Sequence, residues 1–566
     1  MIQCRRSIKS NQKNDMIDKR LITLMIFLFA GFTLWEGWQA RIAPPKAPVG
    51  ATSTAAVPQA SSGNSATSAS VLPAAAPALA GDTFARGERV TVRTDKFLAE
   101  IDTIGGGIRK LTLLQHYAAE DTSKPFTLMQ DNAAPFYITR SGLLGDGLPN
   151  HNSVFAAQAK EYTLEAGKST LEVRLDAPDA NGVKIAKRFV FHRDSYVIDE
   201  SFDITNNGSA ALQPSAYFEF LRDSTPPPGD QRFVSTFTGP AFYNETEKFQ
   251  KIDFSNIDKG KENKVRKSRE GWVAMLQHYF VAAWIPKAGS ELEFYTRKVG
   301  DKYYSAGVVV PVAAVPAGAT ASVTVPLYAG PEEVEKMRAI APGLDLTIDY
   351  SWLTIVATPL FWLLSKIHDY VGNWGVAIIV LTVIIKAAFY HLSAKQYKSM
   401  AQMKVLGPKV EKLKQQYGDD RVKMNQAMME LYKKEKINPL SGCLPIFLQM
   451  PIFLALYWVL LGAVELRHAP FALWIKDLSA ADPYYVLPVL YGITMFITTK
   501  LNPPPPDPIQ AKMMTIMPLM FSVFFFFFPA GLVLYYTVNN ILSIAQQWMI
   551  TRTHAADAAA AGNAKL

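Results

Sequence analysis

Cysteine is nearly absent from this chain of 566 residues, which contains two, Cys4 and Cys443. The long region between residues 84 and 345 has none, which excludes a disulfide framework there. Charged residues are also few, at 19% of the chain against about 25% in typical soluble proteins, whereas apolar residues reach 49%. This composition argues against intrinsic disorder and against a purely soluble enzyme.

The motifs of several enzyme classes are missing as well. The sequence contains neither H-E-x-x-H nor G-x-S-x-G, and its eight histidines are scattered. The glycine run 105–107 lacks a following P-loop lysine and helix, so a tight turn explains it better than a phosphate site. We therefore expect no catalytic residues, no metal site and no cofactor.

Positive charge is concentrated in two segments. The net charge is +9, of which residues 1–20 contribute +4 and residues 391–440 contribute +6. A nucleic-acid-binding protein would carry its basic face on the folded domain, whereas basic segments beside apolar runs are typical of membrane proteins. We expect no DNA partner.

An apolar run covers residues 21–38 and follows Lys19 and Arg20. Its length favours an uncleaved transmembrane signal-anchor over a cleaved signal peptide, with residues 1–20 as a cytoplasmic N-terminus. Met1 and Met16 both stay open as the true start. Residues 39–83 are predicted to be a linker, because Ala, Pro, Ser, Gly and Thr fill 32 of the 43 positions from 41 to 83.

Residues 84–348 consist of short runs in which apolar and polar residues alternate, for example 171–175 and 201–205. Turn signals such as Asn181-Gly182 separate these runs. The pattern predicts a large all-β sandwich domain.

The next apolar run, residues 352–367, is only sixteen residues long and contains Pro359. If it crossed the membrane, the following span would deliver the basic segment 391–440 to the outer side, against the positive-inside rule. We predict instead that residues 349–370 form an amphipathic helix on the outer membrane surface.

Residues 371–550 have the pattern of a helical membrane domain. Its five predicted spans cover about 374–393, 443–464, 484–500, 513–528 and 531–550. With the first span this makes six, so that both termini and the tail 551–566 are cytoplasmic and residues 39–370 are external.

The basic loop 394–440 joins the second and third of these six spans. Its apolar residues recur at helical spacing on either side of Gly418, which predicts a two-helix hairpin. The positive-inside rule alone explains the charge of this loop, and a docking surface for acidic partners or ribosomal RNA is the second explanation.

Polar residues inside the apolar spans are the candidate functional residues. Lys386 lies in the second span, where a charge costs about 2.5–3.5 kcal/mol on insertion scales, and Thr382 precedes it by one helical turn. Gln449 lies in the third span, and Tyr536 is one of many polar residues in the last. Snorkelling and interhelical hydrogen bonds are one explanation, but the excess polarity favours a hydrated groove open to the cytoplasm.

Longer motifs around these residues resemble the YidC family of membrane protein insertases, in the form with a large periplasmic domain. The matching stretches are VGNWG at 371–375, NPL and GC within 438–443, QMPIFLALY at 449–457, VELR at 464–467, APFALWI at 469–475 and GLVLYY at 531–536. The external domain matches more loosely, as at GWVAML, 271–276. The resemblance implies a five-helix insertase core beside the all-β periplasmic domain.

The resemblance also implies roles for particular residues. Its substrate groove would include Lys386, Thr382, Gln449 and Tyr536, and its hydrophobic slide would include Met450, Pro451, Phe453 and Phe524. One departure concerns Lys386, because the family usually has arginine there. The positive charge is kept, but the bidentate guanidinium is not.

By the same resemblance, the protein would reside in the cell inner membrane. Its implied partners are nascent membrane proteins, the Sec translocon and the lipid bilayer, with the ribosome and the signal-recognition-particle receptor as candidate partners of the loop 394–440. A solute transporter is the alternative function, although we see no internal repeat. A sugar-acting enzyme is a second alternative, since the family's external domain resembles the galactose mutarotase sandwich, but no acid/base pair can be assigned in it.

Overall fold

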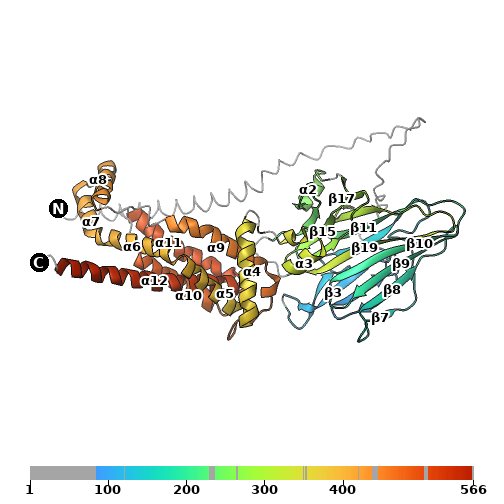
Figure 1. The fold of residues 1–566 in the computed structure, drawn as a ribbon, viewed down its shortest axis with the longest axis horizontal. Helices are drawn as coiled ribbons and strands as arrows, with labels where there is room; N and C mark the ends of the chain where they lie inside the picture. The colour runs from blue at the N-terminus through green and yellow to red at the C-terminus, as the bar shows by residue number, and fades with distance from the viewer. Residues whose placement is uncertain are drawn as a thin grey trace, which may run out of the picture. The chain divides into compact units, whose positions relative to one another are not determined.

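The computed structural model describes residues 84–119, 121–228, 236–262, 265–348, 350, 353–417, 420–435, 444–502 and 508–563. A β domain comes first along the chain and a helical region follows it (Figure 1). Residues 508–516 belong to a different compact unit from the rest of the described chain. The expected signal-anchor at 21–38 and the linker at 39–83 lie outside the described residues, as does Gly418.

A nine-stranded sheet is the largest part of the β domain, in the order β13-β12-β15-β16-β19-β10-β9-β8-β6. Its strands are β6 (Ala156–Ala157), β8 (Thr170–Asp176), β9 (Val183–His192), β10 (Val197–Asn206), β12 (Gly239–Tyr243), β13 (Gln250–Lys251), β15 (Trp272–Gln277), β16 (Phe280–Trp284) and β19 (Thr320–Pro331). The expected alternating runs 171–175 and 201–205 fall in β8 and β10, so these two strand predictions are confirmed.

Two five-stranded sheets complete the domain, in the orders β4-β3-β2-β1-β7 and β14-β17-β18-β11-β5. The first contains β1 (Arg89–Arg93), β2 (Phe97–Asp102), β3 (Ile108–Tyr117), β4 (Pro125–Met129) and β7 (Glu161–Thr163). The second contains β5 (Tyr137–Leu144), β11 (Ser215–Asp223), β14 (Arg266–Ser268), β17 (Leu292–Val299) and β18 (Tyr303–Pro311). A short helix, α2 (Phe254–Asp258), interrupts the strands.

Aromatic side chains join the nine-stranded sheet to the β11 sheet. The Phe218 ring of β11 lies 5.9 Å from the ring of Phe202 on β10 and 5.2 Å from that of Trp284 on β16. All three side chains are fully buried. The sandwich core therefore lies between these two sheets, as the alternating pattern predicts.

Helices follow β19, beginning with α3 (Val334–Ile340), the 3₁₀ helix η1 (Leu344–Thr347) and α4 (Thr354–Val371). Helix α4 has two different faces. Ala357, Phe361 and Leu364 are buried at helical spacing, whereas Ile355 and Trp362 are exposed. The helix ends at Gly372, whose φ of 65° suits glycine.

The remaining helices cover most of the predicted membrane domain. They are α5 (Trp374–Ala388), α6 (Tyr390–Val405), α7 (Gly407–Tyr417), α8 (Arg421–Lys434), α9 (Leu444–Gly462), η4 (Val464–Leu466), α10 (Val486–Leu501), α11 (Pro508–Phe524), η5 (Phe525–Phe527) and α12 (Ala530–Asn563). By length and composition, no single described helix could cross a membrane, although α5 and α6, bent by 68° at their junction, could do so as a pair.

Candidate functional site

The start of α5 is fixed by contacts with the loop that precedes α10. The Asn373 side chain accepts a hydrogen bond from the Val376 backbone N–H (3.0 Å) and donates one to the Phe471 carbonyl (2.9 Å). Gly375 packs so closely that a Cβ atom there would lie 2.1 Å from the Phe471 ring. These contacts join two of the sequence motifs and set the rotation of the helix that carries Thr382 and Lys386.

Lys386 is half-buried near the end of α5, and its ammonium group is turned toward α12. The Nζ atom donates a hydrogen bond to Ser543 Oγ at 2.7 Å, and Ser543 Oγ donates in turn to the Asn539 carbonyl at 2.7 Å. Within the described part of the chain, no carboxylate forms an ion pair with Lys386. The cation is therefore held inside the helical region by a neutral partner.

Thr382 lies one turn before Lys386 and is only 1% exposed. Its hydroxyl donates a hydrogen bond to the Ile378 carbonyl of the same helix, at 2.7 Å. Since a hydroxyl has one proton, the oxygen of Thr382 is left as an acceptor.

Tyr536 belongs to an aromatic cluster that also contains Phe453, another of the predicted site residues. Its ring centroid lies 6.0 Å from that of Phe453 on α9 and 5.3 Å from that of Phe525 in η5. The structure thus brings a residue expected in the groove into contact with one expected in the slide, in the distance range of favourable aromatic pairs.

The other predicted slide residues differ in exposure. Met450 on α9 and Phe524 on α11 are 44% and 41% exposed, respectively. Gln449 and Pro451, which flank Met450, are half-buried. Met450 and Phe524 therefore present more apolar surface than Gln449 and Pro451 present to their surroundings.

Several polar residues of α12 form hydrogen bonds to other helices. Asn540 donates to Thr494 Oγ1 (3.3 Å), Gln546 to the Tyr390 carbonyl (3.3 Å) and Gln547 to Asn502 Oδ1 (3.1 Å). Interhelical hydrogen bonding, one of the two explanations considered for the polarity of this span, accounts for these three residues. Lys386 differs from these three residues because it is charged. Its hydrogen-bond partner, Ser543, is neutral and does not compensate that charge.

Ser543 is the contact residue that sequence reasoning did not single out. It follows Tyr536 by seven residues, which is about two helical turns, so both side chains lie on one face of α12. That spacing is the signal from which Ser543 could have been selected among the polar residues of the span.

The β domain contains a buried charged cluster that sequence reasoning also missed. The Glu219 carboxylate lies 2.5 Å from Arg140 and 3.2 Å from Arg297, and it accepts a hydrogen bond from the Tyr295 hydroxyl at 2.9 Å. Burial by itself would raise the pKa of Glu219, but the two guanidinium groups outweigh it and hold that pKa at about 2. A carboxylate with so low a pKa, held by three partners, is a poor general base, which argues against a catalytic role for Glu219.

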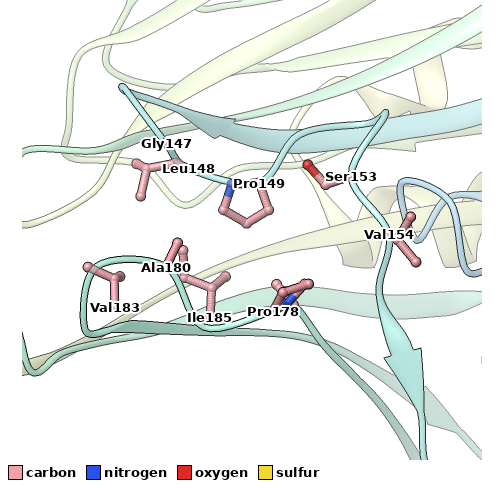
Figure 2. Close-up of a pocket in the computed structure, with 10 residues that line it drawn as sticks. Gly147, Leu148, Pro149, Ser153, Val154, Pro178, Ala180, Val183 and Ile185 are labelled. Carbon is pink, nitrogen blue, oxygen red and sulfur yellow. The ribbon is translucent and has the colours of Figure 1, made fainter.

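A cavity of about 340 Å³ lies in the same domain, between the loop 147–154 and the turn 177–185. Figure 2 shows Leu148 and Pro149 facing Val183 and Ile185 across it. None of the residues that line it is charged, so the lining offers no acid/base pair for sugar chemistry.

Comparison with known proteins assigns both halves of the described chain. Residues 89–363 match the model of the YidC periplasmic domain, and residues 366–557 match that of the 60Kd inner membrane protein family. The chain belongs to the YidC family of membrane protein insertases. Membership confirms the expected inner-membrane insertase, with a β-rich periplasmic domain and a helical C-terminal region.

Curated relatives are similar over nearly their whole length. The membrane protein insertase YidC of Nitrosospira multiformis is 51% identical over 557 residues, which cover 95% of this chain and 97% of that protein. The YidC of Methylobacillus flagellatus is 52% identical over 559 residues, covering 97% and 100%. A solved structure of an active YidC insertase with its first transmembrane domain resolved is 21% identical, with a TM-score of 0.35, and covers 81% of this chain and 94% of its own.

Proposed function

We propose that this protein inserts nascent membrane proteins through a hydrophilic groove that is open to the cytoplasm and to lipid. The observation that carries the proposal is the orientation of Lys386, whose ammonium group is bonded to Ser543 on a neighbouring helix. A charge kept among helices, with no carboxylate of the described chain paired to it, favours a wet site over a dry, tightly filled bundle. The groove residues in this proposal are Lys386, Thr382, Gln449 and Tyr536.

The groove would act by lowering the cost of moving polar polypeptide into the bilayer. Each backbone amide that enters hydrocarbon without a partner costs several kcal/mol. A wet recess on the cytoplasmic side shortens the hydrocarbon path and offers hydrogen-bonding groups to the crossing segment. The process makes and breaks no covalent bond, so the proposal includes no catalytic residue, metal or nucleotide.

The slide would supply the path by which the apolar part of the substrate reaches lipid. Met450 and Phe524 expose apolar side chains, and Phe453 connects α9 to the aromatic cluster at Tyr536. Flexible Met and flat Phe side chains adapt to many different apolar helices. Together with Pro451 these residues form the hydrophobic slide of the proposal.

Lys386 would attract acidic groups of the translocating segment. A lysine ammonium is a compact point charge, so its attraction does not depend on the bidentate geometry of arginine. The attraction is stronger in a groove than in bulk water, because the local dielectric constant is lower. We therefore propose that lysine replaces the family's usual arginine without loss of function.

We propose the following topology. Residues 21–38 and the helical segments at 374–393, 443–464, 484–500, 513–528 and 531–550 span the inner membrane, both termini are cytoplasmic, and residues 39–370 are periplasmic. The exposed Ile355 and Trp362 of α4 would face the outer membrane surface.

The hairpin of α7 and α8 is the proposed docking element for cytoplasmic partners. An ion pair of 2.5 Å between Lys409 and Glu435 links its two ends, and the apolar side chains of Val422 and Met429 are exposed. Its excess of basic residues suits the ribosome or the signal-recognition-particle receptor, and the Sec translocon is the proposed partner in the membrane.

Reconstitution tests the proposed function. The full chain is purified, placed in liposomes without nucleotide and supplied with a radiolabelled substrate protein of one or two spans. We expect protease-resistant integration of the substrate above that in empty liposomes, and no flux of small solutes. Solute flux without integration would favour the transporter and contradict the proposal.

A further inference from the structure

Ser543 occupies an unusual position, because its single hydroxyl is engaged on both sides. The oxygen accepts a hydrogen bond from Lys386 Nζ at 2.7 Å, and its proton is donated to the Asn539 carbonyl at 2.7 Å. A hydroxyl carries one proton and two lone pairs. Since the proton is committed to the backbone of α12, the oxygen is fixed as an acceptor that faces the ammonium group.

A third helix, α6, packs against α12 in this region. One turn further along α12, Gln546 donates to the carbonyl of Tyr390, the first residue of α6. Ser543 is thus placed where α5, α6 and α12 meet, beside the 68° bend between α5 and α6.

A lysine at the position of Lys386 has another available orientation. It lies two residues before the end of α5, and its flexible side chain is long enough for the charge to move toward the aqueous end of the helix. The hydrogen bond to Ser543 opposes that movement. It occupies one of the three ammonium protons and leaves two for other acceptors.

We propose that Ser543 is a positioning residue for the groove charge, which holds the ammonium group of Lys386 where carboxylates of a translocating segment can pair with it. The inference rests on the proposed function of the groove. It adds a statement about substrate specificity. The insertion rate depends on Ser543 when the translocated segment is acidic, and hardly at all when that segment is neutral.

Two matched substrates and three variants of the full chain test the inference in proteoliposomes. The substrates are a one-span protein with Asp and Glu in its translocated segment and the same protein with Asn and Gln in their place. Ser543→Ala removes the acceptor, and Ser543→Thr keeps a hydroxyl. Thr537→Val is the control, since Thr537 bonds only to the Val533 carbonyl of its own helix among the hydrogen bonds described for it.

We expect Ser543→Ala to lower the insertion rate of the acidic substrate about tenfold, the equivalent of one hydrogen bond to a charged group. The neutral substrate should be inserted at the wild-type rate, within about twofold, which also reports that the variant is folded. Ser543→Thr should restore the acidic substrate, and Thr537→Val should resemble the wild type with both.

Equal losses for both substrates would overturn the inference, because a merely structural role affects them alike. It would also be overturned if Ser543→Ala had no effect, or if Ser543→Thr were as impaired as Ser543→Ala, while the wild type inserts both proteins. A wild type that inserts neither substrate would overturn the proposed function together with the inference. The two failures are therefore distinguishable.

Discussion

Lys386 and Ser543 form the hydrogen bond that joins the charged end of α5 to α12, with 2.7 Å between Nζ and Oγ. A lysine that only served as a snorkelling anchor would turn away from the helices and toward the membrane surface. The observed direction places a positive charge against α12, the helix that also carries Tyr536, and gives the insertase account its physical basis.

Replacing Lys386 tests whether the charge itself is used. We expect Lys386→Arg to retain insertion within about twofold, because the charge is kept. Lys386→Glu should lower it at least tenfold, because a negative charge repels acidic segments and has no donor for Ser543. The measurement is the insertion rate in proteoliposomes. Equal insertion rates for the two variants and the wild type would show that the charge of Lys386 has no role in insertion.

The slide predicts where a substrate helix makes contact. A photo-crosslinking amino acid at Met450 or Phe524 should capture a nascent membrane helix during insertion, because both side chains are exposed and apolar. The same probe at Val154, an exposed residue of the β domain, is the control. Crosslinks at Val154 alone would place substrate contact outside the helical region.

The cluster around Glu219 predicts an acid-sensitive stability. Glu219→Gln should cost about 3 kcal/mol at pH 7, because it removes the counter-charge of the buried Arg140 and the partly buried Arg297. The folded-state pKa of Glu219 is about 2, below its ordinary 4.5, so this stabilisation is complete above pH 4.5 and is lost as the pH falls toward 2. Thermal unfolding followed by circular dichroism should show the largest difference in midpoint near neutral pH. A difference that grows with acidification would contradict this assignment.

Glu332 predicts the opposite dependence of stability on pH. Burial raises its pKa to about 7, partly offset by Lys251 and a hydrogen bond to Thr347, so the folded protein binds a proton more tightly than the unfolded chain. Stability contributed by this group is present below pH 4.5 and declines as the pH rises toward 7.

Glu332→Gln should therefore raise the unfolding midpoint at pH 8 and leave it nearly unchanged at pH 4. Glu335→Gln is the control, because the side chain of Glu335 is 78% exposed. If the two variants have the same midpoint at every pH, the account of Glu332 is wrong.

The sequence predicted the sandwich because alternation reports directly on which residues face a core. It could not predict the Glu219 cluster. Arg140, Glu219 and Arg297 lie on β5, β11 and β17, and only the order of strands in the sheet brings them together. Spacing along a chain carries no information about such partners.

In the helical region, too, the sequence predicted only part of the structure. The run 374–393 is predicted as one continuous span, yet α5 ends at Ala388 and the chain bends by 68° before α6. No proline or glycine marks this bend in the sequence, so the hydropathy pattern does not reveal it. The polar residues of α12 could not be told apart from the sequence. The packing of the helices shows that Asn540 and Gln547 form neutral interhelical hydrogen bonds, whereas Ser543 contacts a charged group.

Water access to the groove is the central claim, and thiol labelling measures it most directly. Cys4 and Cys443 are replaced by serine, and single cysteines are placed at Gln449 and, as the control, at Ile541, which is 50% exposed on α12. A charged, membrane-impermeant thiol reagent is then added from the cytoplasmic side. Only a hydrated thiol ionises and reacts readily. The account predicts labelling of Gln449→Cys at least tenfold faster than Ile541→Cys, and equally slow labelling of both would contradict it.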